Sequence, residues 1–262
     1  MNKNKTTFLF LGTGASTGIP LIGCECPICL SEDPYNKRFR PSALLKVGDK
    51  QILIDIGPDF RYQMLENRIT HLDGVMLTHT HYDHIAGLDE LRTFYLLHRR
   101  VIPLIVSKSS LEDLKTRYHY LFREKSCGQS LAAQLDIKTL ESERGISLFL
   151  DIPFQYMTYE QGGMKVTGYR FGNFAYTTDI RDYPETLFED LSGVNTLVMS
   201  ALRHTTSPMH LNLEEAIAFS RAVGAKKTYF THMSHELDHQ TTNAALPEGF
   251  ELAYDGLELC LN

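Results

Sequence analysis

Short apolar runs separated by polar or glycine-containing turns predict strands and helices in alternation along the chain. Strand-like runs occupy 6–12, 43–47, 51–55, 73–78, 101–107, 195–201 and 226–232, with several more within 134–178. Helical spacing occurs at 58–68, 84–98, 109–122 and 212–224, and 250–261 reads as a closing pair of strands. This order is typical of a layered α/β fold. Because no stretch is long enough to act as a linker, we expect one domain over 1–262.

The composition and net charge of the chain argue against several classes of function. Of the 262 residues, 43% are hydrophobic, which suffices for a core without disulfide support. The formal net charge of −6 argues against a general electrostatic grip on nucleic acid or on an anionic membrane. No run approaches the roughly 20 apolar residues of a membrane span, and the N-terminal apolar run is too short for a signal peptide. We therefore expect a cytoplasmic protein that holds any phosphate-bearing substrate locally.

The stretch LTHTHYDHIAG at 77–87 places three histidines and one aspartate within six positions, directly after a predicted strand. His79 and His81 are two residues apart, while Asp83 and His84 lie in the turn that opens the next helix. Side chains arranged in this way can converge on a cation from two directions. Imidazole and carboxylate ligands suit zinc, manganese or iron. We therefore expect a catalytic metal site with room for two ions.

Five cysteines include three in the short motif CECPIC, at Cys24, Cys26 and Cys29. The odd number and the tight spacing are unlike a secreted disulfide framework. Three thiolates need one outside ligand to complete a tetrahedral zinc site, and a free-thiol or redox role is the alternative. Cys127 and Cys260 stand alone and are expected to be ordinary thiols.

Together with LIDIGPD before it and TTD and FTHMSH after it, the histidine cluster resembles the metallo-β-lactamase superfamily of metal-dependent hydrolases, a four-layer αββα sandwich. The resemblance implies two catalytic divalent metals held by six side chains: His79, His81, Asp83, His84, Asp179 and His232. The first histidine pair would bind one metal, and Asp179 would bridge the two. Asp83 is also expected to take part in catalysis. Asp55 matches an aspartate that supports the ligand loops rather than binding metal.

The motifs GCECPICLSEDP and FTHMSHELD narrow the resemblance to the cyclic phosphodiesterase branch that acts on phosphoribosyl 1,2-cyclic phosphate. That branch implies a structural zinc held by Cys24, Cys26, Cys29 and His235. It also implies a catalytic role for His210, which lies just before a helix start. As a protonated imidazole, His210 would contact the substrate phosphate and assist the leaving group.

One position departs from the family pattern. The third histidine of the first metal site is missing, since no histidine lies between His119 and His204. Gln161 falls at the expected place, and Glu160 would supply an oxygen ligand if the register shifted by one. An amide oxygen is a poor zinc ligand, so we expect the first site to be weak or empty or to change its metal preference, and Glu160 as the ligand would favour manganese or iron over zinc.

The sequence therefore predicts a metal-dependent phosphodiesterase, in which a metal-activated hydroxide cleaves a small, cyclic phosphodiester. Its expected cofactors are two catalytic zinc or manganese ions and one structural zinc, and its expected assembly is a homodimer. Two alternatives stay open. One is a tRNA 3′-end endonuclease of the same superfamily, and the other is a metal-binding scaffold weakened by the missing histidine.

Overall fold

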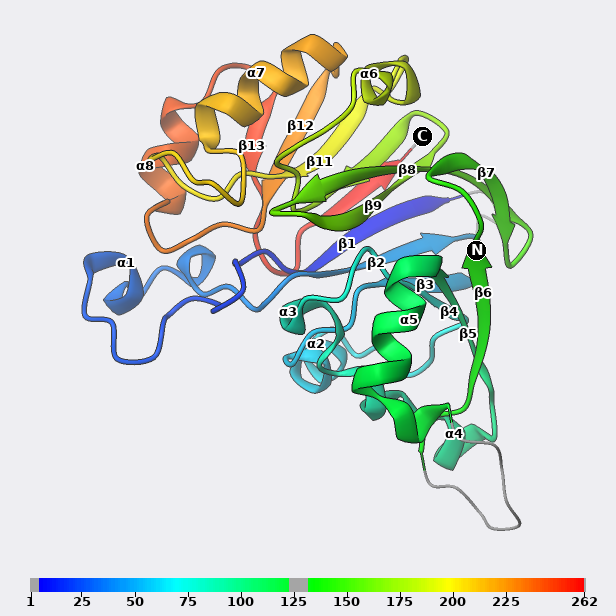
Figure 1. Cartoon of the computed structure of the whole chain (residues 1–262). Coiled ribbons are helices and arrows are strands. Elements are labelled where there is room, and N and C mark those ends of the chain that lie inside the picture. Colours follow the sequence, from blue (N-terminus) through cyan, green and yellow to red (C-terminus); the bar gives the residue numbers. More distant parts are fainter. Residues whose placement is uncertain (1–4, 123–131, 262) are drawn as a thin grey trace.

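The computed structural model describes residues 5–122 and 132–261, and within these ranges the strands form two seven-stranded sheets that face each other (Figure 1). Cys127 lies outside the described residues. The first sheet has the order β14-β1-β2-β3-β4-β5-β6 and the second the order β13-β12-β11-β10-β9-β8-β7. The strands of the first sheet are β1 (Thr6–Gly12), β2 (Ser42–Val47), β3 (Lys50–Ile54), β4 (Gly74–Met76), β5 (Ile102–Ser107), β6 (Leu135–Leu140) and β14 (Glu258–Leu261). Those of the second are β7 (Arg144–Phe149), β8 (Ile152–Gln161), β9 (Met164–Phe171), β10 (Phe174–Thr177), β11 (Thr196–Ser200), β12 (Lys227–Thr231) and β13 (Phe250–Leu252).

Helices cover the outer face of each sheet, which confirms the predicted αββα sandwich (Figure 1). The α-helices are α1 (Pro27–Leu30), α2 (Phe60–Glu66), α3 (Tyr82–Ile85), α4 (Arg92–His98), α5 (Lys108–Arg117), α6 (Thr186–Asp190), α7 (Leu213–Val223) and α8 (His239–Ala245). Short 3₁₀ turns are η1 (Pro34–Asn36), η2 (Leu88–Leu91) and η3 (His119–Leu121). Among the described helices, none has both the length and the apolar character that crossing a membrane requires.

Alternating side chains of β1 show how the core is divided. Phe8 and Phe10 point into the space between the sheets. There the ring centroid of Phe8 lies 4.8 Å from that of Phe174 on β10. Leu9 and Leu11 point the other way and join the apolar cluster under the helices of the first sheet. Since successive strand residues face opposite sides, one apolar run supplies both layers. Burial of both faces explains why the strands read as continuous apolar runs in the sequence.

The segment 84–98, predicted as one helix, is divided into α3, η2 and α4. Gly87 marks the break, because its N–H donates to the carbonyl oxygen of Ile56 at 2.9 Å. A Cβ atom at this position would lie 2.5 Å from the carbonyl oxygen of Gly57. The chain is therefore pressed against the loop after β3, and a regular helix cannot pass through this point.

The segment 250–261 forms two strands as predicted, but they do not pair with each other. β13 pairs in parallel with β12, whereas β14 pairs antiparallel with β1 in the opposite sheet. The turn between them carries the chain across the sandwich, and the N–H of Gly256 donates to the carbonyl oxygen of Phe10 at 2.8 Å. Long-range pairing of this kind leaves no local signal in the sequence.

The carboxyl ends of the parallel strands meet at one edge of the sandwich. β3 and β4 are parallel neighbours in the first sheet, and β10, β11 and β12 are parallel neighbours in the second. The loop after β4 crosses to the second sheet, where the N–H of Thr167 donates to the carbonyl oxygen of Thr78 at 2.9 Å. The hydroxyl of Tyr169 likewise donates to the carbonyl oxygen of Leu77. Loops at the carboxyl ends of strands are the usual place for sites in α/β proteins.

We predict that Gly57→Ala destabilises the protein by about 1–3 kcal/mol, the usual cost of overpacking. A Cβ at residue 57 would lie 2.1 Å from the carbonyl oxygen of Asp83, which is backbone and cannot move aside cheaply. Urea denaturation measures the loss. Gly145→Ala serves as control, because its nearest neighbour is the hydroxyl end of Tyr156 at 3.1 Å. Equal losses in the two variants would show that the close approach at residue 57 has no special cost.

Candidate metal centre

The predicted site residues follow the carboxyl ends of four strands. Asp55 follows β3, the segment 79–84 follows β4, Asp179 follows β10 and His232 follows β12. The backbone φ angles of Asp55, Asp179 and His232 are 61°, 56° and 57°, in the left-handed region. Residues other than glycine adopt this conformation at a cost, and such residues gather where side-chain placement is imposed by function. Strand-end turns thus bring side chains from both sheets together.

Four buried side chains lie around a common point, and we call them the four-ligand site: Asp83, His84, Asp179 and His232. The Nε2 atom of His84 lies 3.4 Å from Asp83 Oδ2 and 3.2 Å from Asp179 Oδ2. The Nε2 atom of His232 lies 3.3 Å from Asp83 Oδ2 and 3.1 Å from Asp179 Oδ1. Each imidazole therefore faces both carboxylates at nearly equal distance.

These separations fit a divalent ion at the centre. Ligands held tetrahedrally at about 2.0–2.1 Å from a metal are about 3.3 Å from one another. The Nε2 atom of His84 is buried and makes no hydrogen bond, although two carboxylate oxygens lie near it. A nitrogen whose lone pair points at a cation has this arrangement. Two imidazoles and two carboxylates form a donor set suited to zinc, manganese or iron.

Asp55 determines the tautomer of a histidine in each half of the cluster. Its Oδ2 atom accepts from His84 Nδ1 at 2.7 Å, which leaves Nε2 of that ring free for metal. The same atom accepts from the Thr78 hydroxyl at 2.7 Å. Because the Thr78 proton is used in that bond, its oxygen can accept from His79 Nδ1 at 2.9 Å. Asp55 thus occupies the supporting position that the sequence predicts, and it acts on His79 as well as on His84.

The electrostatics of the cluster also favour a cation. Burial by itself raises the pKa of Asp83 and Asp179, but the neighbouring His84 and His232 outweigh burial and hold both pKa values well below the usual range. Burial lowers the pKa of His84, yet Asp179 and Asp83 raise it well above its usual value. Ionised carboxylates that are buried need a positive partner, which a proton or a divalent ion supplies. Metal binding here would release a proton.

His79 and His81 lie beside the four-ligand site, and we call them, with the shared Asp179, the two-histidine site. His79 Nε2 is 3.0 Å from His81 Nδ1, and ligand atoms of His79, His84 and Asp179 lie within 4.8 Å of one another. Burial and the nearby His84 lower the pKa of His79 well below its usual value, so its ring is neutral, as a ligand must be. The structure thus gathers all six predicted ligands, and their metal binding stays a prediction.

Gln161 reaches this cluster, and Glu160 does not. The Gln161 side chain is 3% exposed, and its Nε2 atom lies 3.1 Å from Asp179 Oδ1 and 2.8 Å from His210 Nε2. Glu160, the preceding residue on β8, is exposed, and its backbone pairs with that of Asp182. Consecutive strand residues face opposite sides. The structure therefore favours Gln161 for the position of the missing histidine and gives Glu160 no place among the ligands.

His210 precedes α7, as expected, and lies at the rim of the cluster. Its ring stacks on that of His232 with centroids 4.8 Å apart, and its Nδ1 atom is 3.8 Å from Asp179 Oδ1. Burial, together with the charge of His232, lowers the pKa of His210 to about 4. Its imidazole is therefore neutral near pH 7 in the free protein. The catalytic role of His210 stays a prediction.

The cysteine motif forms a second candidate metal site with His235. The Nδ1 atom of His235 lies 3.4 Å from the sulfurs of Cys24 and Cys26 and 3.6 Å from that of Cys29. Zinc bonds of about 2.3 Å to sulfur and about 2.0–2.1 Å to nitrogen give separations of about 3.5 Å in a tetrahedron. The Cys29 N–H donates to the sulfur of Cys26 and lowers the pKa of that thiol to about 6. The group fits the predicted closed Cys₃His site.

A cavity of about 330 Å³ opens onto the histidines and aspartates. Ser16, Tyr82 and Met209 also line it, and sequence reasoning did not single them out. The small residues of GTGASTG at 12–18 were the available signal for Ser16, because such loops can approach a ligand closely. Tyr82 lies inside the histidine motif itself, and Met209 precedes His210.

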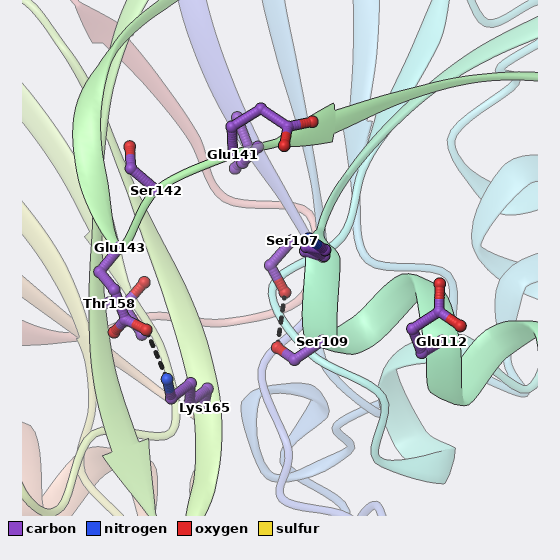
Figure 2. Close-up of a pocket in the computed structure, with 10 residues that line it drawn as sticks. Ser107, Ser109, Glu112, Glu141, Ser142, Glu143, Thr158 and Lys165 are labelled. Atoms are coloured by element: carbon purple, nitrogen blue, oxygen red, sulfur yellow. Dashed lines mark hydrogen bonds and ion pairs between the residues drawn. The ribbon is translucent and has the colours of Figure 1, made fainter.

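A second hollow of about 340 Å³ lies where β5 ends and α5 begins (Figure 2). Two lysines and three glutamates are among its lining residues: Lys108, Lys165, Glu112, Glu141 and Glu143. Figure 2 shows the ion pair between Lys165 and Glu143 and the contact between the Ser107 and Ser109 hydroxyls. With acidic groups in excess, this hollow does not favour an anionic substrate. The metal cluster is therefore the candidate site.

Comparisons with known proteins agree with this geometry. A family model described as a beta-lactamase superfamily domain matches residues 50–233. The crystal structure of a diphosphatase from the PhnP family has a TM-score of 0.89 with this chain and is 36% identical to it, covering 98% of this chain and 97% of that one. The likeness therefore extends over nearly the whole of both chains.

Two further relatives match over only part of their own length. An octanoyltransferase from Porphyromonas gingivalis is 35% identical over 97% of this chain but over 51% of that protein. A ribonuclease Z from Methanopyrus kandleri is 31% identical over 52% of this chain and 46% of that protein. The chain spans about half the length of the octanoyltransferase, so the activity of that whole protein does not carry over.

Asp55→Asn is predicted to weaken zinc binding by the four-ligand site by about 10–100-fold, the usual effect of losing a residue that orients a metal ligand. An amide accepts more weakly from His84 Nδ1 and from Thr78 than a carboxylate does. Competition with a zinc chelator measures the affinity. Asp49→Asn is the matched control, since Asp49 is exposed in the turn at the other end of β3. Unchanged zinc affinity in Asp55→Asn would show that Asp55 is not needed to orient His84.

Cys26→Ala is predicted to release one equivalent of zinc and to lower the midpoint of thermal unfolding by at least about 4 °C, which corresponds to about 1–2 kcal/mol in a chain of this size. The reason is that a closed zinc site contributes directly to folding energy. Metal analysis and a thermal melt measure the two effects. Cys260→Ala removes an exposed thiol and should change neither. A full zinc content in Cys26→Ala would rule out a Cys₃His site.

Proposed function

This chain belongs to the metallo-β-lactamase superfamily of metal-dependent hydrolases, in its PhnP-like branch, and from that premise we propose that it hydrolyses a small phosphodiester. The observation that carries the proposal is the four-ligand site, in which the imidazole nitrogens lie 3.1–3.4 Å from the carboxylate oxygens around a common point. The cavity on which it opens also contains His210. A metal site that faces a cavity is arranged for catalysis rather than for structure.

Divalent ions supply such a site with a Lewis acid for phosphoryl oxygens and with a water acidic enough to attack phosphorus at neutral pH. The protein contributes fixed geometry. The turns after β10 and β12 hold Asp179 and His232, and α3 holds Asp83. Asp55 keeps His84 in the tautomer that leaves Nε2 free. Because these groups are buried, little reorganisation is needed when charge develops on the reacting phosphate.

His210 assists the leaving group in this proposal. Burial lowers its pKa to about 4, so the ring is neutral near pH 7 in the free protein. With Nε2 accepting from the Gln161 amide, the ring proton is on Nδ1, and that N–H can donate a hydrogen bond to the departing oxygen. Such a bond stabilises the negative charge that develops on the leaving group.

The substrate class follows from the size and charge of the site. A cavity of about 330 Å³ accommodates a small molecule, and a chain of net charge −6 offers no general attraction for a polynucleotide. A cyclic phosphodiester is our first candidate. A diphosphate bond is the second, because the PhnP-family protein that resembles this chain over its whole length is a diphosphatase. Both reactions need the same attack on phosphorus.

The metal-loaded protein is predicted to hydrolyse bis-p-nitrophenyl phosphate, and His84→Ala to lose at least about 10³-fold in kcat/KM. The loss follows because removing an imidazole ligand takes away several kcal/mol of charge stabilisation. The absorbance of released p-nitrophenolate measures the rate. His98→Ala, which removes an exposed histidine at the end of α4, should leave it unchanged.

A substrate panel separates the candidates: a 2′,3′-cyclic nucleotide, diadenosine diphosphate and a precursor tRNA with a 3′ trailer. Fastest turnover of the cyclic nucleotide supports the first candidate, and fastest turnover of the dinucleotide supports the second. Preferred cleavage of the tRNA would overturn both in favour of an endonuclease. A protein with full metal content and no turnover of bis-p-nitrophenyl phosphate or of any of these three compounds would instead be a metal-binding scaffold.

A further inference from the structure

We infer that Gln161 is a positioning residue rather than a metal ligand. The centre then has one metal site with a full set of four protein ligands and one site that lacks a ligand. This inference rests on the metal centre of the proposed function and not on its substrate. The four-ligand site has its four side chains. The two-histidine site has His79, His81 and a share of Asp179, with an amide near the place of a third imidazole.

The amide group of Gln161 is fully engaged as a donor. A carboxamide nitrogen carries two hydrogens. The Nε2 atom of Gln161 lies within hydrogen-bond distance of Asp179 Oδ1 at 3.1 Å and of His210 Nε2 at 2.8 Å. One side chain thus holds the carboxylate shared by the two sites and the histidine that faces the substrate.

The opposite orientation of the amide is unfavourable. It would place Oε1 against the ionised carboxylate of Asp179, so that two acceptors would face each other with no proton between them. In the observed orientation Oε1 is buried and has no hydrogen-bond partner. Turning Oε1 toward a metal would take the Nε2 donors away from Asp179 and His210 and leave His210 without its partner. The donor role and the ligand role therefore compete for one amide group.

The backbone around Gln161 supports a positioning role. β8 ends at Gln161, and the next residue is Gly162, where a Cβ atom would lie 2.4 Å from the terminal carbon of Met209. Met209 is adjacent to His210 in the chain. The hairpin between β8 and β9 therefore packs on the loop that carries His210, and the hydrogen bond from Gln161 joins the two at the metal centre.

The consequence is an unequal pair of metal sites. A site of two imidazoles and a shared carboxylate binds a transition metal less tightly than a site of two imidazoles and two carboxylates, since each ligand adds to affinity. We expect the two-histidine site to fill only at metal concentrations well above those that fill the four-ligand and Cys₃His sites. Restoring an imidazole at residue 161 should remove that inequality.

The test is cobalt(II) titration of metal-free wild-type protein, Gln161→His, Gln161→Ala and the control Gln155→Ala. Gln155 lies on the same strand and donates to Asp190, away from the metal centre. Cobalt bound to thiolates absorbs through charge transfer, so the Cys₃His site is counted separately from sites of nitrogen and oxygen ligands. Thermal melts show which variants are folded.

The wild type should take up two equivalents tightly and a third weakly. In Gln161→His the third equivalent should bind at least about tenfold more tightly. Gln161→Ala should still bind three equivalents, and any weakening should affect the four-ligand site as well as the two-histidine site, because Gln161 orients Asp179, which both sites share. Weakening or loss of the third equivalent alone in Gln161→Ala would show that the amide is a ligand. Three equally tight equivalents in the wild type would also overturn the inference. These readouts need no turnover, so they stand even if the proposed substrate class is wrong.

Turnover supplies the positioning readout. With metal content and melting temperature unchanged, Gln161→Ala should lower kcat for bis-p-nitrophenyl phosphate at least about tenfold and change KM less than about threefold, because His210 acts in the transition state rather than in ground-state binding. An unchanged kcat in an active preparation would contradict the positioning role.

Discussion

The structure depends on neutralising three buried carboxylates at the edge where the two sheets meet. Asp55, Asp83 and Asp179 are 0%, 5% and 1% exposed. Burying ionised groups costs several kcal/mol each unless positive charge and hydrogen bonds compensate. Imidazoles from both sheets surround these acids, and a divalent ion at the point between them supplies the charge most effectively. The same ion would join the ends of β4, β10 and β12, so folding and metal binding are coupled at this edge.

A short segment after β12 links the two candidate metal sites. His232 belongs to the four-ligand site and His235 to the Cys₃His group, three residues later. Between them, the N–H of Met233 donates to the carbonyl oxygen of Thr13, and its carbonyl oxygen accepts from Ala15. The buried guanidinium of Arg38 donates to the carbonyl oxygens of Ser234 and Leu237. These contacts sustain the left-handed backbone of His232 and fasten one wall of the cavity.

Much of this arrangement could be predicted from the sequence because its signals are local. The HTHYDH motif contains four predicted metal ligands within six residues. Continuous apolar runs such as 6–12 identify strands that are buried on both faces. The partners of those strands were not predictable, as the separation of 250–261 into two sheets shows. The sequence also did not predict which of Glu160 and Gln161 faces the metal centre, because this depends on the register of β8 in its sheet. The pKa of His210 depends on burial and on charges from distant segments, which no local pattern encodes.

Anomalous diffraction from a crystal grown with zinc would locate a metal at this edge of the sandwich. We expect a strong peak about 2.0–2.2 Å from the Nε2 atoms of His84 and His232 and from one oxygen each of Asp83 and Asp179. A crystal with zinc in the lattice but no anomalous density between these four side chains would contradict this expectation.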